Sequence, residues 1–223
     1  MKRLFLFANW KANKTTEEAR AWLSEMKDWF KNNPSYGDKE IVVFPPYTAL
    51  SFVSSKVYEN EIPMGVGAQD VSLFGRGSFT GEIPVSLVDE FARYCLVGHS
   101  ERRKNFHETD EIISAKVKVA KIALLQPVLC VQDAKTPIPQ GVIFVAYEPV
   151  FAIGSGSPDT PENAASVAAT IKQDNPAVQF VLYGGSVTSE NVHAFTSREH
   201  IDGVLVGKAS LEAKEFAQII QNA

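Results

Sequence analysis

The sequence predicts an α/β protein in which eight parallel strands and their helices close into a (β/α)8 barrel, a single domain covering residues 1–223. Short apolar runs alternate with helical stretches along the whole chain, which is typical of a parallel sheet. Most of these runs are continuously apolar, as strands buried on both faces require. The first run ends in "ANWKAN" without the Gly-x-Gly-x-x-Gly that usually opens a doubly wound sheet, so a closed barrel fits better.

The eight predicted strands are short and rich in β-branched or aromatic residues. They cover residues 3–9, 40–45, 64–70, 95–98, 127–132, 141–147, 179–185 and 203–207. The third is rich in glycine, which gives it the weakest strand pattern of the eight.

Helical patterns follow nearly all of these strands. The first helix has the clearest start, because Thr15 and Glu18 have the spacing of a capping box and an apolar face follows them. Thr160 and Pro161 mark another helix start, since proline is favoured in the first helical turn. The other predicted helices are a weak short one near Thr48, Pro84 through Tyr94, 109–125, one from about Ser189, and 210–221.

The connection between the fifth and sixth strands is too short for a helix. Only "AKTPIPQ" (134–140) joins "CVQD" to "GVIFVAY", whereas a parallel crossover normally takes about a dozen residues or more. We expect this link to run almost directly across the bottom of the barrel. It should leave a stripe of the barrel wall exposed, unless a partner surface covers it.

Composition argues against several classes of protein. The net charge of −4 disfavours a nucleic-acid-binding protein, which needs a basic surface to neutralise phosphates. No apolar run approaches the ~20 residues of a membrane span, and the beginning of the chain does not resemble a signal peptide. Cys95 and Cys130 lie in apolar runs, which indicates core packing in a reducing cytosol. We therefore expect a cytoplasmic protein that binds neither nucleic acid nor membrane.

Polar residues at the strand ends are the candidates for a functional site, because catalytic groups of such barrels lie at the carboxyl ends of the strands. They are Asn9, Lys11, Gln69, Asp70, His99, Ser100, Glu101, Gln132, Asp133, Glu148, Ser186 and Lys208, with glycines at 184, 185 and 207. A carboxylate, an imidazole, an ammonium and an amide group come from strands one, four and six. Glycines follow strands seven and eight, where bare backbone N–H groups can bind a phosphate.

Each of these residues taken singly also has a structural explanation. A strand-end glutamate is usually solvated or paired, and the histidine fits a polar network with the arginines that follow it. "GHSER" (98–102) also suggests a Ser–His hydrolase, but no nucleophile elbow is present. No metal-ligand spacing stands out among the four histidines. Their joint placement at strand ends favours a catalytic site.

Several motifs together resemble the triosephosphate isomerases. They occur in the order of that family and are "NWK" (9–11), "VGHSERR" (97–103), "AYEPVFAIGSG" (146–156), "YGGSV" (183–187) and "GVLVGKASL" (203–211). The resemblance implies a TIM barrel that interconverts dihydroxyacetone phosphate and glyceraldehyde 3-phosphate through an enediolate, in glycolysis and gluconeogenesis, without metal or organic cofactor. "TGEI" (80–83), in the long loop 69–83, resembles the dimer loop of the family and implies a homodimer.

The same resemblance implies a role for each matching residue. Glu148 would be the base that moves a proton between two neighbouring carbons of the substrate. His99, Asn9 and Lys11 would donate hydrogen bonds to the substrate oxygens on which charge develops. Glu101 would orient Lys11 or pair with it, without touching the reacting atoms.

The phosphate site implied by the resemblance acts mainly through main-chain N–H groups. It consists of Gly154, Ser186, Gly207 and Lys208. Residues 149–155 would form a lid over the phosphate. Three features depart from the family pattern: Phe151 stands where tryptophan is usual, Lys208 replaces the second glycine of a pair, and the link 134–140 replaces a full helix.

Two other interpretations stay open from the residues alone. Another phosphate-binding barrel isomerase or synthase would share the glycines of the phosphate site but not "NWK" together with "GHSE". A catalytically silent barrel would serve as a binding or scaffold protein, and the missing helix lends this slight support. The presence of Asn9, Lys11, His99 and Glu148 favours the isomerase.

Overall fold

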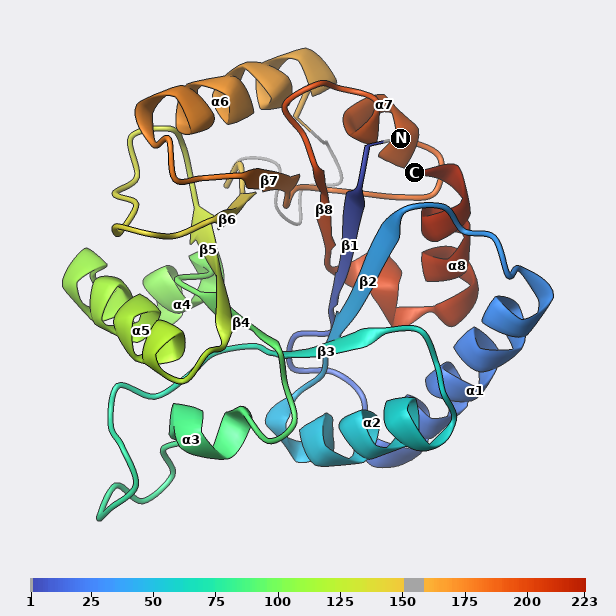
Figure 1. Cartoon of the computed structure of the whole chain (residues 1–223), viewed down its shortest axis with the longest axis horizontal. Coiled ribbons are helices and arrows are strands. Elements are labelled where there is room, and N and C mark those ends of the chain that lie inside the picture. Colours follow the sequence, from blue (N-terminus) through green and yellow to red (C-terminus); the bar gives the residue numbers. More distant parts are fainter. Residues whose placement is uncertain (1, 151–158) are drawn as a thin grey trace.

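The computed structural model describes residues 2–150 and 159–223 and shows a closed barrel of eight parallel strands (Figure 1). The strands follow one another around the barrel in sequence order, and β1 pairs with both β2 and β8 to close it. They are β1 (Leu4–Asn9), β2 (Lys39–Phe44), β3 (Gly65–Ala68), β4 (Tyr94–Val97), β5 (Gln126–Val131), β6 (Phe144–Tyr147), β7 (Phe180–Tyr183) and β8 (Gly203–Val206). The predicted fold class is confirmed.

The helices surround the barrel on the outside (Figure 1). They are α1 (Thr16–Asn32), α2 (Tyr47–Glu59), α3 (Val85–Val88), α4 (Ser100–Asn105), α5 (Asp110–Ile122), α6 (Pro161–Asp174), α7 (Val192–Thr196), the 3-10 helix η1 (Lys208–Leu211) and α8 (Ala213–Asn222). Both predicted helix starts are confirmed: Thr15 and Glu18 form a reciprocal capping box, and the Thr160 side chain accepts from the N–H of Asn163. In the described parts of the chain no helix is both long and apolar enough to cross a membrane.

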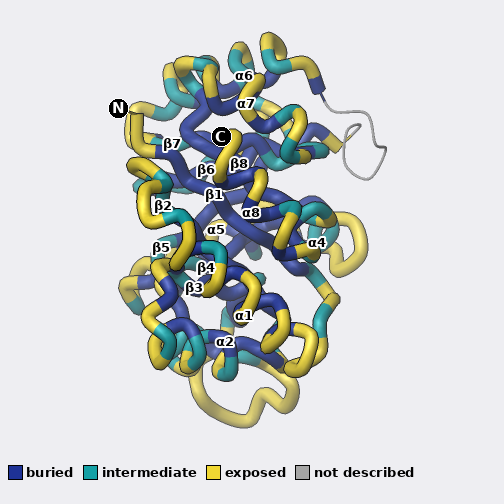
Figure 2. Tube along the Cα trace, turned by 90° about the vertical axis from the view of Figure 1, so that its right-hand side faces the viewer, coloured by how far each residue is buried: buried dark blue, intermediate teal, exposed yellow. Residues whose placement is uncertain are grey.

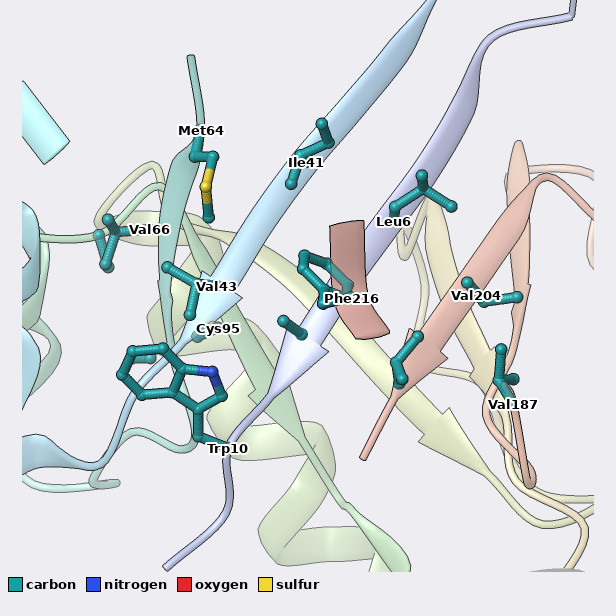
Figure 3. Packing of buried hydrophobic residues seen from close by; sticks show 14 of the residues in the cluster. Leu6, Trp10, Ile41, Val43, Met64, Val66, Cys95, Val187, Val204 and Phe216 are labelled. Carbon is teal, nitrogen blue, oxygen red and sulfur yellow. The ribbon is translucent and has the colours of Figure 1, made fainter. Parts of the chain in front are cut away.

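Two apolar layers hold the barrel together. The inner layer is rich in phenylalanine and includes Phe5, Phe7, Phe44 and Phe144. The outer layer fills the space between the strands and the helices, where Figure 3 shows strand and helix side chains packed together. Figure 2 shows the result, with buried strands at the centre and exposed surfaces on the helices and loops. A Cβ on Gly67 would lie only 2.2 Å from the Phe44 ring, so the weak glycine-rich strand serves close packing.

The predicted helix from Pro84 through Tyr94 is wrong in length. Its helical part, α3, ends at Val88, and Tyr94 already begins β4. The N–H of Arg93 donates to the carbonyl of Val66 at 2.9 Å, so the chain must be extended before Tyr94 to join the ladder with β3. Strand pairing therefore overrides the local helical pattern.

The predicted bare stripe on the barrel wall is also wrong. The link between β5 and β6 contains no helix, as expected, yet Leu129 and Val145 on these strands are fully buried. Val142 is fully buried as well, and Ile138 packs against the same apolar cluster. The short link thus covers the wall with its own side chains, and it lies outside β5 and β6 in Figure 1.

Candidate active site

A cavity of about 730 Å³ opens at the carboxyl ends of the strands, and it brings together the described residues to which the family resemblance gave a role. These are Asn9, Lys11, His99, Glu101, Glu148, Ser186, Gly207 and Lys208. They come from five different strand ends, as the barrel topology requires. The other described polar strand-end candidates, Gln69, Asp70, Ser100, Gln132 and Asp133, do not line the cavity. Gly154, Phe151 and most of the predicted lid fall in 151–158, outside the described residues.

Glu148 follows directly on β6, and its carboxylate is buried with only 1% of the side chain exposed. Its own N–H donates to the carbonyl of Val131 at 2.7 Å, which continues the β5–β6 ladder and fixes its position. The carboxylate accepts from the N–H of Ser100 at 2.8 Å and lies 2.9 Å from Nε2 of His99. Burial raises the pKa of Glu148, but the charge and hydrogen bond of His99 and the N–H of Ser100 outweigh it. The net pKa is lowered, so the group is held ionised.

Glycine 184 makes room for this carboxylate. A Cβ there would lie 3.1 Å from Cγ of Glu148 and 3.2 Å from the carbonyl of Tyr147. The N–H of Gly184 donates to that same carbonyl at 2.7 Å, which keeps the two strand ends in contact. Gly184 therefore serves the packing of the carboxylate in addition to any contact with a ligand.

His99 is the N-cap residue of α4, and its two ring nitrogens have different partners. Nδ1 accepts from the N–H of Glu101 at 3.2 Å, a bond that only an unprotonated Nδ1 can make. When the ring is neutral, Nε2 therefore carries its proton and donates it toward Glu148. Burial lowers the pKa of His99, while the charge and hydrogen bond of Glu148 raise it, with a net rise. That rise depends on the Glu148 contact and disappears if the carboxylate moves away.

Lys11 lies in the loop after β1 with a left-handed backbone, at a φ of 52°. Its N–H donates to the side-chain oxygen of Asn9 at 3.0 Å. Its ammonium group lies 2.5 Å from the carboxylate of Glu101, the partner that the resemblance implied. Lys11 and Glu101 thus form an ion pair at the wall of the cavity.

The opposite wall of the cavity is formed by the ends of β7 and β8. Gly185, Ser186 and Gly207 line it together with Lys208, the first residue of η1, whose side chain is exposed. A Cβ on Gly185 would overlap the hydroxyl group of Tyr183 at 2.2 Å, so a side chain there would displace its neighbour. The two glycines leave main chain accessible at this wall, where N–H groups can bind an anion such as a phosphate.

Strand-end reasoning missed several residues of the site. Glu212 and Glu215 also line the cavity, and Glu215 accepts from the N–H of Ser189 at 2.8 Å. They lie after β8, at the start of α8 and within it, so the rule of polar strand ends did not select them.

A buried charge cluster outside the cavity was missed as well. Lys116 bonds to both carboxylate oxygens of Asp70 and to Glu108, and Arg102 pairs with the same two acids. One signal for it exists in the sequence: Lys116 occupies the apolar face of α5, beside Ile113 and Val117.

The arrangement suits proton transfer next to an anionic group. An ionised, buried carboxylate beside a histidine N–H can remove and return a proton, and the lysine ammonium can stabilise negative charge. Among the described residues, no cluster of histidine, cysteine, aspartate or glutamate is arranged to hold a metal ion. Fold and site together define a (β/α)8-barrel protein with a candidate acid–base site at the carboxyl ends of its strands.

Comparison with known proteins narrows this class to one family. The family model described as triosephosphate isomerase matches residues 4–223. The triosephosphate isomerase of Roseiflexus castenholzii is 38% identical over 252 aligned positions, covering 99% of this chain and 97% of that protein. That of Aquifex aeolicus is 36% identical, with 99% of both chains covered. The crystal structure of triosephosphate isomerase from Bartonella henselae has a TM-score of 0.84 at 29% identity, over 99% of this chain and 98% of that one. The chain belongs to the triosephosphate isomerase family.

Proposed function

We propose that the protein is a triose-phosphate isomerase, which interconverts dihydroxyacetone phosphate and D-glyceraldehyde 3-phosphate in glycolysis and gluconeogenesis. Family membership supports the reaction, and one observation in this chain supports the mechanism. The ionised carboxylate of Glu148 lies 2.9 Å from Nε2 of His99, in the same cavity as the Lys11–Glu101 ion pair. A base, an electrophilic donor and a cation therefore face a single space.

In the proposed reaction, Glu148 removes a proton from the carbon next to the substrate carbonyl. The carbon–hydrogen electron pair forms the double bond of an enediolate, and the carbonyl oxygen takes up the negative charge. His99, Asn9 and Lys11 donate hydrogen bonds to the two oxygens. Protons are exchanged between these oxygens, and the carboxylic acid of Glu148 returns its proton to the neighbouring carbon. The sum is an isomerisation with no net gain or loss of atoms.

Glu148 must leave its present partners before it can reach a carbon atom. Its two carboxylate oxygens are occupied by the N–H of Ser100 and by His99. Substrate that enters the cavity offers His99 a new acceptor, the carbonyl oxygen, and so frees the carboxylate. The proposed base is thus buried and ionised before substrate binds, and binding would release it from its partners.

The phosphate group of the substrate is proposed to lie at the wall formed by Ser186, Gly207 and Lys208. Main-chain N–H groups and the positive charges of Lys11 and Lys208 would attract it. Glu101 is proposed to hold the Lys11 ammonium in place.

A homodimer is proposed from the loop that follows β3. This loop extends away from the barrel near α3 (Figure 1), and residues 74–82 are exposed. Phe74 and Phe79 stack at its tip with ring centroids 4.3 Å apart, and they are 48% and 42% exposed. Two stacked aromatic rings in water suit burial in a partner surface, and a second copy of the chain is the partner that the family resemblance implies. A cytoplasmic location is proposed with the metabolic role.

The function is tested by a coupled assay of glyceraldehyde 3-phosphate conversion on the purified chain. We expect turnover without added metal and competitive inhibition by inorganic phosphate. A folded protein that binds phosphate but shows no turnover would instead be a silent barrel, and the proposal would be wrong.

A further inference from the structure

The backbone of Lys11 is held in an unusual conformation by side chains from the ends of two strands. A φ of 52° is disfavoured for residues other than glycine, so neighbouring contacts must stabilise it. The side chain of Asn9, at the end of β1, accepts from the N–H of Lys11 at 3.0 Å. The carbonyl of Lys11 accepts from Nε2 of Gln69 at 2.8 Å, across 58 positions of sequence.

Gln69 stands directly after β3 and joins two neighbouring strand ends. Its Nε2 also donates to the carbonyl of Phe44, the last residue of β2, at 2.9 Å. Both acceptors are carbonyl oxygens, so the amide nitrogen must face them and the orientation of the group is determined. The carbonyl of Phe44 also accepts from the N–H of Trp10 at 3.1 Å, which brings the β1 loop to the same point.

Gln69 stands apart from the proposed chemistry. It is not among the described residues that line the cavity, and no proposed step of the reaction uses it. The next residue, Asp70, is committed elsewhere, because both of its carboxylate oxygens bond to Lys116. The two hydrogen bonds of the Gln69 amide, to the carbonyls of Lys11 and Phe44, therefore serve to support the Lys11 loop.

We propose that Gln69 is a positioning residue for Lys11. Its amide fixes the Lys11 carbonyl, and with it the left-handed turn that directs the ammonium group toward the cavity and Glu101. The inference rests on the proposed role of Lys11 in binding substrate. A shift of about 1 Å in a group that must meet substrate costs on the order of a hundredfold in rate, so loss of this support should be visible in kinetics.

The test is a double-mutant cycle measured by steady-state kinetics. Gln69→Leu removes both hydrogen bonds but keeps a side chain of similar size. We expect kcat/KM of this variant to fall by about 10- to 100-fold. Lys11→Met removes the ammonium group. In the Lys11→Met background, Gln69→Leu should change kcat/KM by less than about threefold, because Gln69 acts only through Lys11. Equal effects in both backgrounds, or near-native activity of Gln69→Leu alone, would overturn the role.

Gln126→Leu is the matched control. Gln126 begins β5 at the opposite end of the barrel, and its amide also donates to a main-chain carbonyl, that of Pro127, at 3.1 Å. We expect its kcat/KM to stay within about twofold of the wild type. A wild type without turnover would overturn the proposed function itself, whereas an active wild type with unaffected Gln69 variants would overturn only this inference.

Gln69→Glu keeps the size of the side chain, and it tests the same role if the leucine variant does not fold. Ionised glutamate cannot donate to the two carbonyls, while the protonated acid can donate to one. The activity of this variant relative to wild type should therefore rise as the pH is lowered, which a merely structural role would not produce. A ratio that does not change with pH, or failure of both variants to fold, would identify Gln69 as a structural residue and contradict the proposal.

Discussion

Nε2 of His99 lies 2.9 Å from Oε1 of Glu148, so His99, the proposed electrophile, and Glu148, the proposed base, are within hydrogen-bonding distance of each other. Each satisfies the other in a buried position where an unpaired charge would be costly. The same contact lowers the pKa of Glu148 and raises that of His99. The contact therefore keeps Glu148 ionised, and in the proposed mechanism it also blocks the base until substrate separates the two groups.

Shortening Glu148 tests its assignment as the base. Glu148→Asp keeps the charge but withdraws the carboxylate by about one methylene, and a misplacement of ~1 Å can cost on the order of a hundredfold. We expect kcat to fall by about that factor with little change in KM, because the proposed phosphate contacts do not involve Glu148. Steady-state kinetics on a variant shown to be folded by circular dichroism decides the matter. Near-native kcat would remove Glu148 from the mechanism.

The lowered pKa of Glu148 predicts a loss of stability in acid. A group whose pKa is lower in the folded than in the unfolded state binds protons more tightly when unfolded. Its stabilising contribution is complete above the unfolded glutamate pKa of about 4.3 and is lost as the pH falls through the lower folded-state pKa. Urea unfolding against pH should show a smaller acid loss in Glu148→Gln than in the wild type. Parallel curves for the two proteins would contradict the assignment.

Lys116→Met should be strongly destabilising. The Lys116 side chain is 7% exposed, and its ammonium lies 2.6 Å from oxygens of both Asp70 and Glu108. Removing one member of a buried ionic cluster leaves the others uncompensated, which costs about 3–5 kcal/mol. Lys56→Met, which breaks an exposed pair with Glu59, is the control and should cost less than about 1 kcal/mol. Equal free energies of unfolding for the two variants would show that the buried cluster is not needed for stability.

Lys208→Gly tests the departure of the phosphate wall from the family pattern. Main-chain N–H groups stay available in this variant, and the exposed side chain contributes only its charge. We expect KM and the inhibition constant of inorganic phosphate to rise together by a modest factor of about two to ten, with kcat retained. A large loss of kcat would mean that the Lys208 charge acts in the reaction itself.

The loop after β3 provides the test of assembly. Phe79→Asp places a charge in the exposed stack with Phe74, which should weaken burial in a partner surface. Light scattering should show a dimer for the wild type and a shift toward monomer for the variant, with lower specific activity at low protein concentration. Leu124→Asp, at another highly exposed apolar residue, is the control and should stay dimeric. A fully active wild-type monomer at micromolar concentration would refute the homodimer.

Much of the fold was predictable because its signals are local. The capping box of Thr15 and Glu18 needs only one turn of chain, and buried strands are recognisable from short apolar runs. Once the barrel was inferred, its topology also placed residues as distant as Asn9, His99 and Glu148 at one end. The candidate site followed from the rule that strand ends meet there.

The sequence alone therefore determined the eight strands, their order and the main polar residues that share the top of the barrel, although it did not predict α4 after β4. Only the tertiary structure decided features that depend on contacts between distant segments. The N–H of Arg93 bonds to the carbonyl of Val66 and so draws the chain into the sheet, which is why the helix does not continue to Tyr94. The buried side chain of Val142 covers the part of the barrel wall that the short link was expected to leave exposed. The amide of Gln69 meets the carbonyl of Lys11 across 58 positions, and Lys116 meets Asp70 across 46. Such pairs form because barrel closure brings buried and half-buried polar groups together, and leaving such groups unpaired costs free energy, which no local pattern of residues records.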